Sequence, residues 1–136
     1  MAEVLVIEDD SASRDLLLRI LAPEGHSVIF AENGAVGLKK LAEARVDIVL
    51  TDLLMPVLEG LETIREIRRL QSNVKIVAIS GIYSDYLDAA IALGANATLR
   101  KPIQPSALRD TMATLLSEPS AGGSSRTAHR KRYRSG

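Results

Sequence analysis

The sequence predicts an α/β fold in which one parallel β-sheet carries helices on both of its faces. Five short apolar runs of strand length alternate along the chain with segments of helical periodicity. The first run, Val4–Ile7, is apolar at every position, as expected for a strand buried on both faces. Because parallel strands need crossover connections, this alternation predicts a doubly wound sheet with right-handed crossovers.

The first half of the chain supplies three of the strands and two helices. A helix follows the first strand, where Ser11 or Asp10 can cap its start and Pro23 and Gly25 end it. A second helix opens at Asn33-Gly34. The other two expected strands are Ser27–Ala31 and Val46–Thr51. The apolar faces of these helices comprise Leu16, Leu17, Ile20, Leu21, Leu38 and Leu41.

The second half continues the alternation with three helices and two strands. The helix expected over Ser84–Leu93 is stopped by Gly94 at a C′ position, and Pro105 lies near the first turn of the last helix. The two expected strands are Val74–Ile79 and Ala97–Arg100. The third and fifth helices have apolar faces formed by Leu61, Ile64, Ile67 and Leu70, and by Leu108, Met112, Leu115 and Leu116.

Composition limits the function further. The 136 residues suffice for one domain with a core, and the absence of cysteine excludes disulfides and thiolate chemistry. The start of the chain lacks a basic segment, and no apolar run approaches the roughly 20 residues of a membrane span, so we expect a cytoplasmic protein.

Charge divides the chain into a domain at residues 1–117 and a tail at 118–136. The tail carries five of the 17 basic residues but one of the 17 acidic residues, which leaves residues 1–117 with a net charge of −4. An acidic domain disfavours direct nucleic-acid binding, so any contact with nucleic acid is expected from the basic tail. The Ser- and Gly-rich start of the tail is typical of a flexible, disordered linker.

Reactive polar residues stand at the ends of four strand-like runs. Glu8 and Asp9 follow the first run, Asp52 the third, Ser80 the fourth and Lys101 the fifth. In an open α/β sheet the carboxyl ends of the strands form the ligand-binding edge. Three carboxylates with one ammonium predict a hard-cation site that contains a potential nucleophile.

These four motifs, in this order and spacing, resemble the receiver domain of two-component response regulators over residues 3 to about 117. The resemblance implies a flavodoxin-like, five-stranded sheet of order 2-1-3-4-5, an order for which this family is a standard example. It implies that Asp52, which precedes Met55-Pro56, is the phosphoacceptor. It also implies that Mg²⁺ is held by Glu8, Asp9, Asp52 and the backbone carbonyl of Leu54.

The resemblance assigns roles to three more residues. Lys101, carried on a cis Lys101–Pro102 peptide, would pair with Asp52 and later with a phosphoryl oxygen. Ser80 would donate its hydroxyl to that oxygen and move with it. Thr98 stands where the family usually has Tyr or Phe and is too small to fill the same space, which leaves Tyr83 or Tyr86 as the alternative aromatic residue. Leu54 and Ile82 are apolar where they flank the hydrolytic water, which predicts a long-lived phosphoryl group.

The resulting expectation is a phosphoacceptor that assists its own phosphorylation and is no turnover enzyme. A sensor histidine kinase or histidine phosphotransfer protein would donate the phosphoryl group, and a downstream protein would bind the face of the fourth helix, fifth strand and fifth helix. The alternative is a pseudo-receiver that binds partners independently of phosphorylation. Three other functions are disfavoured. In a flavodoxin, Glu8-Asp9-Asp10 would repel the phosphate of the flavin. A P-loop enzyme needs a motif that is absent here, and a haloacid-dehalogenase phosphatase needs a D-x-D spacing that is missing after the first strand.

Overall fold

The predicted sheet is confirmed by the computed structural model, which describes residues 1–53, 57–81 and 84–118. Five strands pair in parallel in the order β2-β1-β3-β4-β5, so β5 lies at an edge with β4 as its neighbour. The strands are β1 (Glu3–Ile7), β2 (Ser27–Ala31), β3 (Ile48–Asp52), β4 (Lys75–Ser80) and β5 (Ala97–Arg100).

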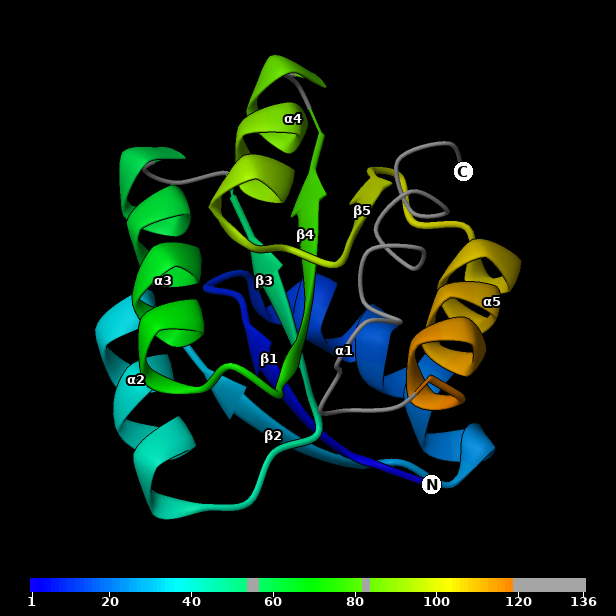
Figure 1. Ribbon diagram of the computed structural model, residues 1–136. Helices are drawn as coiled ribbons and strands as arrows, with labels where there is room; N and C mark the ends of the chain where they lie inside the picture. The colour runs from blue at the N-terminus through cyan, green and yellow to red at the C-terminus, as the bar shows by residue number, and fades with distance from the viewer. Residues whose placement is uncertain (54–56, 82–83, 119–136) are drawn as a thin grey trace.

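Helices cover both faces of the sheet, as Figure 1 shows. The helices α1 and α5 contact each other on one face, while α2, α3 and α4 form a row on the other. A short 3-10 helix at Ala22–Glu24 follows α1. The helices are α1 (Ser11–Leu21), α2 (Gly34–Glu43), α3 (Val57–Leu70), α4 (Ser84–Leu93) and α5 (Pro105–Leu116).

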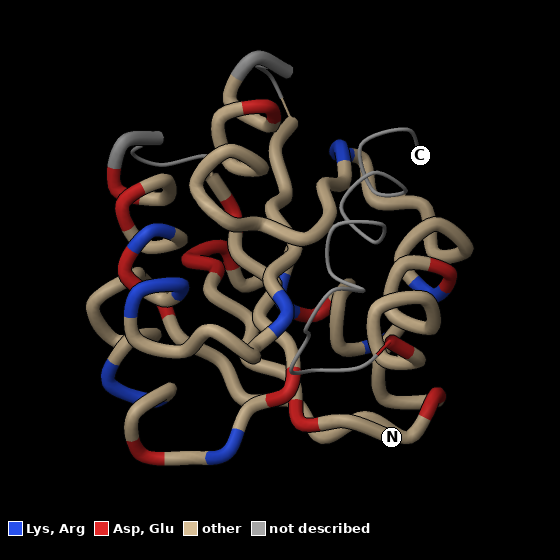
Figure 2. The backbone as a smooth tube through the Cα atoms, in the orientation of Figure 1, with Lys and Arg blue, Asp and Glu red and all other residues tan. Residues whose placement is uncertain are grey.

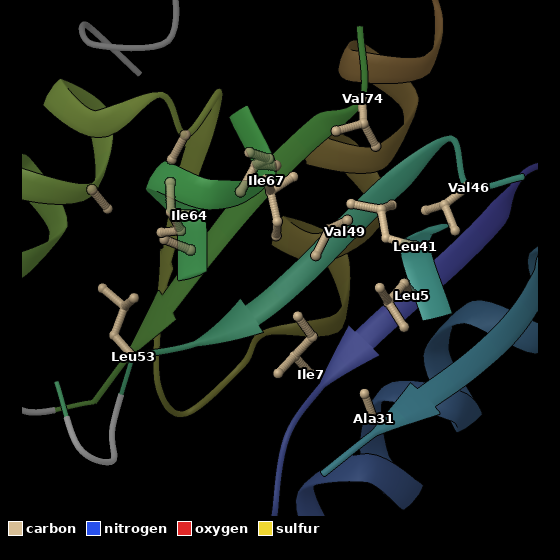
Figure 3. Packing of buried hydrophobic residues seen from close by; sticks show 14 of the residues in the cluster. Leu5, Ile7, Ala31, Leu41, Val46, Val49, Leu53, Ile64, Ile67 and Val74 are labelled. Atoms are coloured by element: carbon tan, nitrogen blue, oxygen red, sulfur yellow. The ribbon is translucent and has the colours of Figure 1, made fainter. Parts of the chain in front are cut away.

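Each face of the sheet has its own core, because strand side chains alternate between the two faces. Leu5, Ile7, Val49 and Leu53 point toward α2, α3 and α4, where Ile64 and Ile67 are fully buried (Figure 3). The opposite face holds a second cluster under α1 and α5, which includes Val4, Val6, Ile48, Leu50, Leu108 and Leu115. The sheet is therefore a rigid platform for the side chains at the ends of its strands.

Several local expectations need correction. Asp10, and not Ser11, is the N-cap of α1, since its carboxylate accepts a hydrogen bond of 2.9 Å from the amide of Ser13. Leu16 and Leu70 are 42% and 56% exposed because each sits at the margin of its apolar stripe, beyond the reach of the sheet. Figure 2 shows the outer part of α3 as intermixed acidic and basic positions.

Two strands, β3 and β4, start later than predicted, at Ile48 and Lys75, and each ends one residue later. Val46 and Asp47 precede β3, and the Asp47 carboxylate accepts a hydrogen bond of 2.9 Å from the amide of Glu3. Asp52 and Ser80 are consequently the last residues of β3 and β4. An apolar run reports burial, whereas strand limits follow from backbone pairing, so the two differ by one or two residues.

The amino edge of the sheet, where the strands begin, contains a cavity of about 560 Å³ near the end of α5. Inside it, Lys75 Nζ lies 3.9 Å from Glu118 Oε1, and the two side chains are 11% and 6% exposed. Burial lowers the pKa of Lys75, and Glu118 partly opposes that effect. Residues 119–136 lie outside the described part of the chain, so the domain boundary and the flexible tail stay predictions.

Candidate functional site

The carboxyl edge of the sheet brings together side chains from positions far apart in the sequence. Glu8 follows β1, Asp52 ends β3, and Lys101 follows β5. Lys101 Nζ lies 2.8 Å from Asp52 Oδ2 and 3.6 Å from Glu8 Oε1. The predicted meeting of these three residues is present in the structure, and the Lys101–Pro102 peptide is cis, as the resemblance implied.

Both carboxylates in this group are buried. Glu8 is 3% exposed and Asp52 is 5% exposed, whereas the Lys101 side chain is 25% exposed. The ammonium therefore closes the site from the solvent side. A buried pair of acids tolerates ionisation only if a cation is close, because removal of a charge from water is costly.

Burial, together with a hydrogen bond to Asp52, raises the pKa of Glu8 to about 7. The amide of Asp10, which donates to Glu8 Oε2 at 3.1 Å, and the charge of Lys101 oppose this rise. Near neutral pH, the protonated and the ionised forms of Glu8 are therefore both populated. A cation with more charge than one ammonium would favour the ionised form.

The pKa of Lys101 is raised as well, but for Lys101 this favours the charged form. Burial alone would lower its pKa, but the hydrogen bond to Asp52 and the charges of Asp52 and Glu8 outweigh burial, so the pKa of Lys101 is raised. The ammonium consequently stays protonated at neutral pH. A fixed positive charge beside Asp52 is suited to hold an anion there.

The predicted metal ligands are only partly assembled. Glu8 and Asp52 are close, but Asp9 is exposed at the rim, and Leu54 lies outside the described residues. Among residues 1–53, 57–81 and 84–118, no three His, Cys, Asp or Glu side chains are close enough to hold a metal ion. The donor chemistry still fits Mg²⁺, because oxygen ligands with a crowded negative charge are what this ion prefers.

The two predicted switch residues lie on neighbouring strands. Ser80 is 6% exposed at the end of β4, and its carbonyl accepts a hydrogen bond of 3.0 Å from the amide of Lys101. Thr98 is half-buried on β5, opposite Ala78 of β4. Ile82 lies outside the described residues, so its predicted effect on hydrolysis stays a prediction.

A groove of about 180 Å³ adjoins Lys101 and separates α1 from the segment that follows β5. Leu16 and Leu17 form part of its α1 side, while Pro102 and Ile103 form the other. Leu16, at the margin of the apolar stripe of α1, therefore also lines a groove next to the buried acids.

The sequence patterns did not single out Arg68 or Asn96. Arg68 on α3 donates hydrogen bonds to the carbonyl of Gly94 and to the side-chain amide oxygen of Asn96. The nearest signal is that Arg68 directly follows Ile67, at the border of the apolar face. That position suggests partial burial, but no pattern predicts its partners, which lie 26 and 28 residues later.

Comparisons with known proteins agree with this geometry. The chain is 35% identical over 109 residues to the transcriptional regulatory protein GlrR of Escherichia coli, a match that covers 79% of this chain and 24% of GlrR. It is 29% identical to the chemotaxis protein CheY of Halobacterium salinarum, over 84% of this chain and 96% of CheY. The chain spans about a quarter to a half of the length of the curated relatives it matches first.

Solved structures give the same result. A response regulator receiver domain protein from Clostridium thermocellum superposes with a TM-score of 0.80 at 28% identity, covering 86% of this chain and 95% of the other. CheY4 of Vibrio cholerae superposes with a TM-score of 0.75 at 29% identity, over 85% and 98% of the two chains.

No helix within the described segments is long and apolar enough to cross a membrane. The family model of the response regulator receiver domain matches residues 4–113, which contain the sheet except its first residue, Glu3, and the acidic site. On this match, the chain belongs to the response regulator receiver family of two-component signal transduction.

Proposed function

We propose that this receiver accepts a phosphoryl group on Asp52 and thereby switches its binding to other proteins. The observation that carries the proposal is the position of Lys101 Nζ, 2.8 Å from Asp52 Oδ2, at the buried carboxyl edge. An ammonium there holds the acceptor in place and offsets the charge of an incoming phosphoryl group. A purely structural ion pair would gain little from such burial, because desolvation opposes it.

The reaction follows from these contacts. One oxygen of Asp52 attacks phosphorus in line, the new bond makes an acyl phosphate, and the bond from phosphorus to the donor breaks. If the donor is a phosphohistidine, the electron pair returns to the imidazole nitrogen. Lys101 then exchanges its carboxylate oxygen for a phosphoryl oxygen, and Ser80 is the hydroxyl that would follow it.

Glu8, Asp9, Asp52 and the backbone carbonyl of Leu54 would hold Mg²⁺. When bound, the ion supplies neutralisation of the charge that opposes the approach of two anions. Glu8 gives up its proton in this arrangement, and Asp9 must turn from the rim toward Asp52. The burial and the neighbouring Asp52, which raise the pKa of Glu8 to about 7, support a cation at this place.

The partners follow from the chemistry of the site. A sensor histidine kinase or a histidine phosphotransfer protein is the donor, and the groove beside Lys101 offers it a surface. The downstream target binds the face of α4, β5 and α5. The receiver assists its own phosphorylation and dephosphorylation in the cytoplasm but turns over no separate substrate.

The test is labelling with acetyl phosphate and Mg²⁺, followed by intact-protein mass spectrometry. The parent should gain one phosphoryl group that is lost in base, and Asp52→Asn should gain none. Asp47→Asn is a matched control, because Asp47 lies at the opposite edge of the sheet and should leave labelling unchanged. Full labelling of Asp52→Asn would refute the assignment.

A pseudo-receiver is the second candidate, and the observation that favours it is Thr98, which is too small to replace the usual aromatic switch residue. Mg²⁺-dependent labelling separates the two candidates. A protein that folds, binds its partner and takes no label in the presence of Mg²⁺ and acetyl phosphate is a pseudo-receiver.

A further inference from the structure

We propose that Arg68 and Asn96 are positioning residues for Lys101, because they fix the register of the edge strand that carries it. The inference rests on the proposed function, in which Lys101 assists phosphorylation of Asp52. Neither residue touches the acidic site. They act at the amino end of β5, whereas Lys101 follows its carboxyl end.

The strand β5 needs such support because it is short and sits at the edge of the sheet. It has four residues, all of them half-buried or exposed, and pairs with β4. Two backbone hydrogen bonds bracket it: the Asn96 amide donates to Ile76 O at 2.7 Å, and the Lys101 amide donates to Ser80 O at 3.0 Å. A short strand with few neighbours is weakly specified in register.

Asn96 supplies an extra bond at the start of this ladder. Its side-chain oxygen Oδ1 accepts a hydrogen bond of 2.8 Å from the amide of Ile76, so both backbone groups of Ile76 are held by the same residue. A slip of one residue would replace Asn96 at this place by Ala95 or Ala97, and neither can accept the bond. The side chain therefore selects one register.

Arg68 holds Asn96 from the opposite side. Its Nη2 donates to Asn96 Oδ1 at 2.9 Å and to Gly94 O at 2.8 Å, so the turn before β5 is bound to α3. Its Nη1 donates to Ser72 O at 2.9 Å and Val74 O at 2.8 Å, which ties the same guanidinium to the segment before β4.

One side chain thus fixes the starts of β4 and β5 relative to each other. Burial lowers the pKa of Arg68, but a guanidinium remains charged at neutral pH, and charge-assisted bonds to it are strong. Gly94, with φ of +126°, allows the close approach, because a Cβ there would lie 2.9 Å from Arg68 Cγ.

The consequence appears at the other end of the strand. In the observed register Ser80 lies opposite Arg100, and Lys101 follows directly, with its ammonium at Asp52. A one-residue slip would send every side chain of β5 to the opposite face of the sheet. Even partial fraying of β5 would lengthen the Lys101–Asp52 contact and lower the fraction of molecules poised for phosphoryl transfer.

The experiment compares rates of Asp52 labelling by acetyl phosphate with Mg²⁺. The variants are Asn96→Ala, Asn96→Asp, Arg68→Lys, Lys101→Met and the double variant Asn96→Ala with Lys101→Met. We expect Asn96→Ala to slow labelling about tenfold, since displacement of a positioned group has effects of this size or larger. Asn96→Asp keeps the acceptor oxygen and should restore most of the rate. Arg69→Ala, on the exposed side of α3, is the matched control.

The double variant separates positioning from general stability. If Asn96 acts through Lys101, its replacement should slow labelling no further once Lys101 is Met. An independent loss of similar size in both backgrounds would overturn the inference. So would an Asn96→Ala protein that labels at the parent rate.

Hydrogen exchange of the Lys101 amide gives a readout that needs no phosphorylation. The amide should exchange faster in Asn96→Ala and Arg68→Lys but not in Arg69→Ala or Lys101→Met. If the parent takes no label, the proposed function fails, yet exchange still decides whether Arg68 and Asn96 hold β5. Unchanged exchange in both variants would refute the positioning role alone.

Discussion

The two edges of this sheet use the same residue types in opposite ways. At the carboxyl edge, the charges of Glu8, Asp52 and Lys101 are paired with one another. At the amino edge, Arg68 is bound to carbonyl and amide oxygens and Asp47 accepts a backbone amide, beside one side-chain pair, Lys75 with Glu118. The first arrangement leaves charges that a new ion can rearrange, whereas the second fixes backbone segments in place.

The difference teaches where this fold can change state. A buried charge that bonds to the backbone cannot move without exposing unsatisfied groups, so it stabilises one structure. A buried charge that faces another side chain can exchange its partner at lower cost. The Lys101–Asp52 pair at the carboxyl edge is therefore suited to switching, and Arg68 at the amino edge is suited to anchoring.

The largest expected effect is the loss of stability when the contacts of Arg68 at the amino edge are removed. Arg68→Ala should lower the free energy of unfolding by about 2–4 kcal/mol, because several partly buried carbonyls lose a charge-assisted partner. Urea denaturation measures the change. Arg69→Ala, whose exposed pair with Glu66 is worth little, should change stability by less than about 1 kcal/mol. Equal effects of the two substitutions would remove the proposed contrast.

The second prediction concerns the buried carboxyl group of Glu8 at the carboxyl edge. The pKa of Glu8 is raised to about 7 from 4.5, so its favourable contribution is complete below pH 4.5 and is lost as the pH rises through 7. Glu8→Gln has no such loss. Without divalent cations, the free energy of unfolding of Glu8→Gln should exceed that of the parent by about 1–3 kcal/mol at pH 8, and the two should differ little at pH 4.5. A pH-independent difference would place the cause elsewhere.

A third effect concerns the cation. We expect Mg²⁺ to bind the folded state alone, so it should raise the melting temperature of the parent by a few degrees, about 3–5 °C per kcal/mol gained for a domain of this size. Replacement of Glu8 by Gln and Asp9 by Asn should remove the increase. Asp47→Asn at the amino edge should keep it. If the double variant responds like the parent, the ion binds at another place.

The smallest effect sharpens the contrast at the amino edge. His26 Nδ1 accepts a hydrogen bond of 3.1 Å from the amide of Ala2, and burial lowers the pKa of this imidazole. Its contribution is present above pH 6.5 and is lost as the pH falls below that value, because a protonated Nδ1 cannot accept the bond. His26→Gln should thus narrow the stability difference between pH 7.5 and 5.5 by about 0.5–1 kcal/mol. An unchanged pH profile of unfolding would contradict this role.

Sequence alone predicted the strand–helix alternation and the residues of the acidic edge. Periodicity reports burial directly, and the ends of parallel strands must share an edge, so Glu8, Asp52 and Lys101 could be placed together before any coordinates. Caps and strand limits were less certain. Asp10 caps α1 in place of the neighbouring Ser11, since both residue types are good caps and only backbone geometry chooses between them.

What the sequence determined is therefore the fold class, the faces of most helices and the chemistry of the carboxyl edge. What only the tertiary structure decided is how charges are satisfied: that Lys101 lies closer to Asp52 than to Glu8, that Asp9 stays at the rim, and that Arg68 binds the turn before β5. The physical reason is range. Periodicity is a property of neighbouring residues, whereas a hydrogen bond between α3 and a turn 26 residues later depends on the packing of the whole domain.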